Sequence, residues 1–346
     1  MLIGRAPLRI SFGGGGTDLE AYYARYGGMV ISASINKYIY GTLTKNFDRC
    51  FQVISADLQS VYNTANNHAK NEATELRLPK AVVDHFDLNG AFNLFTASEV
   101  PPGTGLGSSG TTAVNLVNIF ATLTDRPMTK EQVAETAFHV EVRKLGAPVG
   151  KQDQYASAFG GINCIKFEPD KVTVEPLRLT RGTRRKLERS LMLFFTGNSR
   201  QAWAILKQQR DATSSQEGIV IESLHNIKTL AVNMRDALES GDLDGFGRLL
   251  DESWQHKKKL ASNISTEHID QAYAEAKAQG ALGGKITGAG GGGFLLLYCP
   301  PEQQPAMRIA LEALGLREMR FAFEFQGARV LMNTTSLDPT DGWGEE

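Results

Sequence analysis

Cysteine is scarce in this chain of 346 residues and offers no pairing pattern. Cys50, Cys164 and Cys299 stand far apart, and no CxxC pair occurs. An odd number of isolated cysteines is typical of a protein in a reducing compartment, and it excludes a disulfide framework or a zinc knuckle. We therefore expect a cytoplasmic protein.

Long apolar runs and a surplus of charge of one sign are also absent. The longest apolar runs, such as 294–298 (FLLLY), are far too short to cross a bilayer, and the opening MLIGRAPLRI lacks the apolar core of a secretory signal. With 37 basic and 38 acidic side chains the formal net charge is −1, which gives no support for nucleic acid or an anionic membrane as a partner. The local basic runs 181–189 and 257–259 are interpreted as solvated helix faces. We expect no nucleic-acid or membrane partner, and the oligomeric state stays open, with a homodimer among the options.

The length of the chain is more than one hydrophobic core comfortably supports, so two domains are expected. β-rich stretches dominate the first half, whereas long helical stretches fill most of the second half. This pattern predicts an α+β fold. We place the division in a basic, turn-rich segment, which gives one domain of residues 1–180 and another of residues 181–346.

Glycine, in contrast, is abundant and unevenly distributed. Three windows hold four, four and seven of the 35 glycines: 13–16, 101–112 (PPGTGLGSSGTT) and 283–294 (GGKITGAGGGGF). Glycine costs backbone entropy on folding, so such runs need a reason. One cluster is typical of a turn, but three clusters spread over both expected domains predict loops that converge on one ligand.

The middle window lies directly before a helix that the sequence predicts to follow Ser109. Backbone N–H groups at a helix N-terminus form a natural anion site, because they lack partners and lie at the positive end of the helix dipole. The hydroxyls of Ser108 and Ser109 could cap this helix, or they could ligate a magnesium ion carried by nucleotide phosphates. The preceding glycines favour phosphate binding. A dinucleotide fingerprint also matches at residues 105–110, which leaves a dehydrogenase as an alternative, but a lone match is weak.

Two carboxylates follow this window. In 131–145 (EQVAETAFHVEVRKL), helical spacing places Glu141 in one stripe with Ala134 and Ala137. A carboxylate in an apolar stripe is costly unless it is paired or bound to metal, so we expect a metal or cation beside Glu141. Asp153 lies in a loop just before another expected helix. It could be the N-cap of that helix, or it could position or deprotonate an attacking hydroxyl.

Three motifs, in order along the chain, resemble those of the GHMP small-molecule kinases such as galactokinase, homoserine kinase and mevalonate kinase. They are 6–19 (APLRISFGGGGTDL), 101–113 (PPGTGLGSSGTTA) and 285–294 (KITGAGGGGF). The resemblance spans nearly the whole chain. It implies an N-terminal domain like domain 2 of ribosomal protein S5, a C-terminal ferredoxin-like domain, and an active site in the cleft between them. It also implies ATP as phosphoryl donor and Mg²⁺ as cofactor.

The resemblance carries roles onto matching positions. The ATP phosphates would be held by Gly103, Thr104, Gly105, Leu106, Gly107, Ser108 and Ser109. Ser109 and Glu141 would hold Mg²⁺, Asp153 would be the catalytic base, and Arg9 would lie near the transferred phosphoryl group. The substrate would be bound by Gly13, Gly14, Gly15, Gly16, Thr17, Asp18, Arg200, Gly288, Gly290 and Gly291.

Within the family, the chain looks most like the sugar kinases that phosphorylate the anomeric hydroxyl of D-glycero-D-manno-heptose 7-phosphate. FGGGGTD (12–18) and FFTGNSRQA (194–202) carry this finer resemblance. The product would be the 1,7-bisphosphate, which leads to nucleotide-activated heptose and surface polysaccharide. A fucokinase, a galactokinase-like sugar 1-kinase, and a sensor that binds sugar and nucleotide without catalysis are the alternatives.

The first motif departs from that of galactokinase at one place. Gly15 and Gly16 stand where galactokinase has Glu-His. Without those side chains there is room beyond the sixth sugar carbon, and a negative charge that would repel a phosphate is gone. The vacated backbone N–H groups can themselves bind an anion. We hypothesise that residues 13–16 accommodate the side chain of the heptose or its 7-phosphate.

Overall fold

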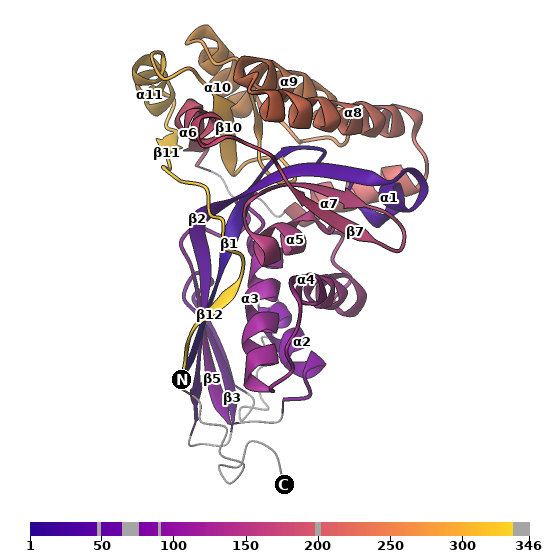
Figure 1. Ribbon diagram of the computed structural model, residues 1–346, viewed down its shortest axis with the longest axis vertical. Helices are drawn as coiled ribbons and strands as arrows, with labels where there is room; N and C mark the ends of the chain where they lie inside the picture. The colour runs from indigo at the N-terminus through magenta and orange to yellow at the C-terminus, as the bar shows by residue number, and fades with distance from the viewer. Residues whose placement is uncertain (47–49, 64–75, 89–90, 198–201, 335–346) are drawn as a thin grey trace.

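The computed structural model describes residues 1–46, 50–63, 76–88, 91–197 and 202–334 (Figure 1). Two sheets organise this part of the chain. The larger sheet has the order β12-β1-β2-β5-β3-β4, and β6 and β7 extend it from β2. Its strands are β1 (Leu2–Gly13), β2 (Gly28–Lys45), β3 (Phe51–Ser55), β4 (Ser60–Asn63), β5 (Phe92–Ser98), β6 (Ile162–Phe167), β7 (Val172–Pro176) and β12 (Arg329–Asn333).

Helices cover one face of this sheet (Figure 1). They are α1 (Glu20–Tyr26), α2 (Arg77–His85), α3 (Ser108–Leu123), α4 (Lys130–Phe138), the π-helical segment η2 (His139–Lys144) and α5 (Gln152–Phe159). The helix α3 is almost entirely buried and packs on β1 and β2. The approach is so close that a Cβ at Gly4 or Gly41 would overlap the side chain of Ile119. This packing fixes the N-terminus of α3 relative to β1.

The second sheet lies in the other half of the molecule and has the order β11-β8-β10-β9, with antiparallel pairing throughout. Its strands are β8 (Leu191–Phe195), β9 (Gly283–Ile286), β10 (Phe294–Tyr298) and β11 (Arg317–Glu318). The helices of this half are α6 (Arg181–Ser190), α7 (Ala202–Ser214), α8 (Gly218–Ser240), α9 (Leu243–Lys257), α10 (Glu267–Ala278) and α11 (Gln304–Ala313). This strand order and the two β–α–β units are those of a ferredoxin-like domain. The prediction of an α+β fold is confirmed.

The last strand complicates a simple division of the chain. After β11 the chain returns to the first sheet, where β12 pairs with β1 from Leu2↔Asn333 to Arg5↔Arg329. We retain a division near residue 180 as a proposal, with β12 completing the N-terminal sheet. Among the described residues no helix has both the length and the apolar character that a membrane span requires, and the three cysteines are free and buried.

The two halves share an apolar core. The buried residues Leu8, Ile10 and Phe12 of β1 pack in one cluster with residues of α8, α9 and β10. The ring of Phe12 meets that of Phe246 edge-on, with the centroids 5.4 Å apart. The C-terminal half of β1 is therefore held between the two halves, and the polar side chains of the same strand lie at their junction.

Candidate active site

A cavity lies at this junction, and all three glycine windows line it. Its lining includes Gly15 and Gly16 from the first window and Gly288 from the third. The second window contributes Gly103, Gly105, Gly107, Ser108 and Ser109. The second and third windows touch each other, since a Cβ at Gly288 would overlap the Cα of Gly105. Segments almost 300 residues apart in the sequence thus meet around one cavity, as the glycine clusters predicted.

The middle window forms a loop of left-handed turns that leads into α3. Gly103, Gly105 and Gly107 have φ angles of 73°, 82° and 80°, which favour glycine. Gly107 is the N-cap of α3, and no side chain caps the helix. The structure therefore contradicts the alternative in which Ser108 or Ser109 caps α3. The N-terminus of α3 is left for another partner.

Glu141 is buried beside this loop, with 2% of its surface exposed. It lies on the π-helical segment η2 rather than on a continuous α-helix. Such segments often occur at functional sites. Its carboxylate accepts hydrogen bonds from Ser109 Oγ and Gln154 Nε2, both at 2.5 Å. Burial raises the pKa of Glu141 to about 7, although these two hydrogen bonds lower it.

In the described part of the chain, Glu141 has no basic side chain as partner: Arg143 forms its ion pair with Glu20 instead, at 2.9 Å. The carboxylate is thus desolvated without a compensating positive charge. Together with the hydroxyl of Ser109 it offers only oxygen ligands, which is the donor set that Mg²⁺ prefers. These residues fit a hard divalent cation.

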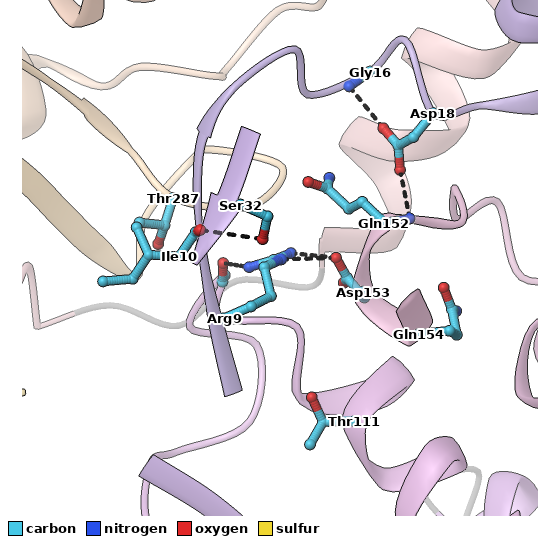
Figure 2. Close-up of polar contacts among 12 residues, drawn as sticks. Arg9, Ile10, Gly16, Asp18, Ser32, Thr111, Gln152, Asp153, Gln154 and Thr287 are labelled. Carbon is cyan, nitrogen blue, oxygen red and sulfur yellow. Dashed lines mark hydrogen bonds and ion pairs between the residues drawn. The ribbon is translucent and has the colours of Figure 1, made fainter. Parts of the chain in front are cut away.

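Arg9 and Asp153 form an ion pair at the wall of the cavity (Figure 2). Arg9 is only 2% exposed, and its Nε and Nη2 contact Asp153 Oδ1 at 2.8 and 2.6 Å. Its Nη1 donates to the carbonyl of Gly105 at 2.7 Å. Asp153 is not an N-cap, since α5 begins at Gln152 and the N-cap is Lys151. Arg9 therefore ties Asp153 to the glycine loop.

Asp18 lies across the cavity at the end of the first window. Its carboxylate accepts from the backbone N–H groups of Gly16 at 3.0 Å and Gln152 at 3.3 Å (Figure 2). Burial, and then the charge of Asp153, raise the pKa of Asp18 to about 6. Asp18 lines the cavity, so its carboxylate can contact a ligand there.

Gly13, Gly14 and Thr17 have packing roles instead. A Cβ at Gly13 would press on Met234 Sδ, and one at Gly14 would overlap the carbonyl oxygen of Met29. The hydroxyl of the fully buried Thr17 donates to the carbonyls of Gly14 and Met29 at 2.7 and 3.0 Å. Of the first window, the cavity lining contains Gly15 and Gly16 but neither Gly13 nor Gly14. Of the two residues that follow the window, Asp18 lines the cavity and Thr17 does not. We therefore restrict the hypothesised substrate pocket at residues 13–16 to Gly15 and Gly16.

Four more of the expected contact residues lie outside this lining. Thr104 and Leu106 are fully buried, and Gly290 and Gly291 pack against residue 264, where Gly291 N donates to the carbonyl of Ile264 at 2.8 Å. Arg200 lies outside the described residues. Gly288 of the third window does line the cavity.

Sequence reasoning missed two lysines of the cavity wall, Lys257 and Lys285. The run 257–259 was interpreted as a solvated helix face. Lys257 instead turns inward at the end of α9, where its Nζ donates to the carbonyls of Ile286 and Gly288. Lys285 sits in β9, which is buried along its whole length. The available signal at Lys285 was a charged residue next to isoleucine and shortly before the glycine-rich residues 288–293.

Three uncharged side chains of the wall were also missed. Ser11 Oγ, Gln152 Oε1 and Gln209 Nε2 are buried polar atoms, and none of them has a hydrogen-bond partner within the described ranges. Buried polar groups are normally paired, so these atoms mark places where a ligand hydroxyl would fit. Gln209 gave no sequence signal, because a glutamine in an amphipathic helix is ordinary.

Two family models match the chain: the GHMP kinases N terminal domain over residues 73–161 and the GHMP kinases C terminal over residues 234–314. The chain is 32% identical over 331 residues to a D-glycero-alpha-D-manno-heptose 7-phosphate kinase of Campylobacter jejuni, which covers 94% of this chain and 97% of that protein. The chain belongs to the GHMP kinase family. As a GHMP kinase it uses ATP as phosphoryl donor, which confirms the predicted class of enzyme.

Two further relatives of this GHMP kinase are sugar kinases by name. A solved structure named as a D-glycero-D-manno-heptose 1-phosphate kinase, from Bacteroides thetaiotaomicron, matches with a TM-score of 0.76 and 29% identity, covering 97% of this chain and 100% of that one. An L-fucokinase/L-fucose-1-P guanylyltransferase of Bacteroides fragilis is 24% identical over 345 residues. That match covers 88% of this chain, but only 35% of the bifunctional protein.

Proposed function

We propose that this GHMP kinase transfers the γ-phosphoryl group of ATP to the anomeric hydroxyl of D-glycero-D-manno-heptose 7-phosphate, giving the 1,7-bisphosphate. The reaction would serve the synthesis of nucleotide-activated heptose for surface polysaccharide, in the cytoplasm. The observation that carries the chemistry is the Arg9–Asp153 pair, held against the glycine loop in the cavity that Asp18 also lines. The 32% identity to a heptose 7-phosphate kinase supports the choice of sugar.

The loop 103–109 and the start of α3 would bind the ATP phosphates. Left-handed glycines turn the backbone there, and α3 begins at Ser108 without a side-chain cap. Its first N–H groups and the positive end of its dipole are therefore suited to a polyphosphate. Phosphoryl transfer needs mainly positioning and charge stabilisation, which such a loop provides without a covalent step.

Ser109 and Glu141 would hold Mg²⁺ through the Ser109 hydroxyl and the Glu141 carboxylate. When bound, the ion would neutralise charge on the β- and γ-phosphates. Gln154 fixes one oxygen of Glu141 through its hydrogen bond and so sets the orientation of the carboxylate. Glu141 must be ionised for this role. Burial raises its pKa, and a bound cation would favour the ionised form again.

Asp153 would accept the proton of the attacking sugar hydroxyl. Both contacts from Arg9 go to Oδ1, so we assign the proton to Oδ2. Arg9 holds the carboxylate in place and supplies positive charge beside the transferred phosphoryl group, where negative charge develops. A positioned general base contributes about 10²–10⁴ in rate.

Asp18, Ser11, Gln152 and Gln209 would receive the sugar. They surround Gly15 and Gly16, and three of them present buried polar atoms without a partner in the described segments. A site that must hydrogen-bond its substrate rejects analogues that leave such atoms unpaired. Gly15 and Gly16 leave the space in which the heptose side chain or its phosphate would lie.

A panel of acceptors tests the proposal. ADP release is measured with Mg–ATP and heptose 7-phosphate, mannose, fucose or galactose, and NMR of the product identifies the phosphorylated hydroxyl. We expect kcat/KM for heptose 7-phosphate to exceed that of the other sugars by about 100-fold or more, with the new phosphate on the anomeric carbon. A preference for fucose or galactose would assign the enzyme to another sugar, and no ADP release with any sugar would indicate a sensor.

A further inference from the structure

Two lysines approach the cavity from the C-terminal half of the molecule. Lys285 of β9 is 3% exposed, and its Nζ donates to the carbonyl of Phe12 at 3.2 Å. Lys257, the last residue of α9, donates from Nζ to the carbonyls of Ile286 at 2.7 Å and Gly288 at 2.6 Å. Both residues line the cavity.

Neither lysine has an acidic partner in the part of the chain that the structure describes. The acidic residues of the cavity wall are Asp18 and Asp153. Asp153 is paired with Arg9, and Asp18 accepts from backbone N–H groups. The partners of the two ammonium groups are main-chain carbonyls, which satisfy hydrogen bonds but do not neutralise charge.

The two charges also repel each other and Arg9. Burial, then the neighbouring Arg9, lower the pKa of Lys285 to about 7. Burial, then Lys285 and Arg9, lower the pKa of Lys257 well below its ordinary value. Each lysine therefore holds its proton less strongly than an exposed lysine does, and a bound anion would favour the charged form of both.

The position of the pair indicates what that anion is. Through Phe12, Lys285 adjoins the first glycine window, and through Gly288, Lys257 adjoins the loop 103–109. The pair therefore lies between the proposed sugar and nucleotide pockets, on the C-terminal side. Two ammonium groups with spare N–H donors match a phosphate dianion in charge and hydrogen bonding.

We propose that Lys257 and Lys285 form a phosphate subsite, separate from the glycine loop, that binds a phosphoryl group of a substrate. This inference rests on the proposed function, which supplies two such groups: the phosphate of the sugar and the polyphosphate of ATP. The shared chemistry is ammonium–phosphate pairing. The test below distinguishes the two sources.

The test compares Lys257→Met and Lys285→Met with the wild-type enzyme. Methionine keeps the length and removes the charge. Lys258→Met is the matched control, because the neighbouring Lys258 forms an exposed pair with Asp270 at 3.8 Å and does not line the cavity. KM and kcat are measured for heptose 7-phosphate, for the same heptose without phosphate, and for ATP.

If the sugar phosphate is the ligand, each variant raises KM for heptose 7-phosphate by about tenfold or more and leaves KM for the unphosphorylated heptose and for ATP within about twofold of the wild-type value. If the nucleotide is the ligand, KM for ATP rises instead and the two heptoses are affected equally. Lys258→Met changes none of these values. Unchanged KM values in both cavity variants overturn the inference.

Thermal melting separates binding from structure. Each variant removes a charge without an acidic partner among the described residues, but also the hydrogen bonds from Nζ to main-chain carbonyls. Since these effects oppose each other, the variants should melt close to the wild-type temperature without ligand. They should also lose the upward shift that inorganic phosphate gives the wild type. A lowered melting temperature with an intact ligand-induced shift identifies structural lysines and overturns the inference. If the wild type does not phosphorylate heptose 7-phosphate, the proposed function fails, and the melting shifts alone decide the role of the lysines.

Discussion

Arg9 and Asp153, 144 positions apart in the chain, lie with Nη2 and Oδ1 at 2.6 Å. The same guanidinium donates to the carbonyl of Gly105, so one side chain joins strand β1, helix α5 and the glycine loop. The proposed base, the proposed charge beside the phosphoryl group and the proposed phosphate loop are thereby held in one arrangement. Such preorganisation is how an enzyme stabilises developing charge without reorganising during the reaction.

Replacing Asp153 by asparagine should lower turnover far more than substrate affinity. The amide keeps the size of the side chain but cannot take the proton, so we expect kcat to fall about 10²–10⁴-fold. KM for ATP and for the sugar should stay within about threefold of the wild-type value. Steady-state kinetics measure both. Asp211→Asn is the control, since within the described residues the carboxylate of Asp211 pairs with its neighbour Arg210 on the surface. An unchanged kcat in Asp153→Asn would remove the residue from the role of base.

Gly15 offers the sharpest test of the space around the sugar. Its added Cβ would lie 3.7 Å from Ser11 Oγ and 4.0 Å from Gln152 Nε2, which are ordinary contacts. Gly16 is unsuitable, because it has a φ of 97° and its Cβ would overlap Gln209 Nε2. Gly15→Ala should fold normally. Gly15→Glu should lower kcat/KM for heptose 7-phosphate by about 100-fold, mostly through KM, because the carboxylate repels the phosphate.

The control is to measure kcat/KM of Gly15→Ala and Gly15→Glu with a sugar that carries no phosphate. Gly15→Glu should cost less with galactose or unphosphorylated heptose than with heptose 7-phosphate. Equal losses with both kinds of sugar would show that only space matters at this position. Full activity of Gly15→Glu on heptose 7-phosphate would show that the pocket lies elsewhere.

Glu141 should make stability depend on pH. Its pKa is about 7 in the folded protein, against an ordinary value of 4.5. As pH rises, Glu141 loses its proton in the unfolded chain before it does so in the folded protein. The free energy of unfolding therefore falls between about pH 4.5 and about pH 7. The full effect is about 3 kcal/mol, from about 1.4 kcal/mol for each pH unit.

Glu141→Gln removes this titration. Urea unfolding should show the variant more stable than the wild type by about 3 kcal/mol at about pH 8, and equally stable at about pH 4. With Mg–ATP its activity should fall by about 100-fold or more, since an amide is a poor ligand for Mg²⁺. A stability difference that is the same at both pH values would contradict the assignment of a buried, unpaired carboxylate.

Gly105 is required where the glycine loop meets the third window. It has a φ of 82°, and a Cβ there would overlap the carbonyl group of Thr287. Gly146 has a φ of 70° but no atom within 4 Å of its added Cβ. Gly146→Ala should cost about 1 kcal/mol of stability from backbone strain alone. Gly105→Ala should cost more and raise KM for ATP by about tenfold or more, because the loop must move. Equal KM for ATP in both variants would show that the loop is not the phosphate site.

The sequence singled out the residues that short motifs specify, and the structure brings them together in or beside one cavity. The glycine windows, Arg9, Ser109, Glu141 and Asp153 are recognisable because a phosphate loop and its partners need particular residues at particular spacings. The α+β class followed from the pattern of strand-like and helical stretches, and the ferredoxin-like half followed from the family resemblance. These features depend on local chemistry, which a single sequence displays directly.

Other features depend on how segments that are distant in the sequence pack against each other in the fold. The periodicity of Ala134, Ala137 and Glu141 fits an α-helix, and no residue type marks where a π-helical turn begins, so the segment His139–Lys144 could not be predicted. The run 257–259 has the composition of a solvated face, yet Lys257 turns inward because α9 ends beside Ile286. The pairing of β12 with β1 was also beyond prediction, since a short strand gives no sign of its partner.

That return of the chain has a consequence for motion. The polypeptide crosses between the two halves twice, once between β7 and α6 and again between β11 and β12. A single linker would let one half swing freely in several directions. With two crossings and an apolar core shared through Phe12 and Phe246, the two halves are held in one relative orientation. Lys257 and Lys285 therefore line the cavity opposite the N-terminal half in an arrangement that the fold sets before any substrate binds.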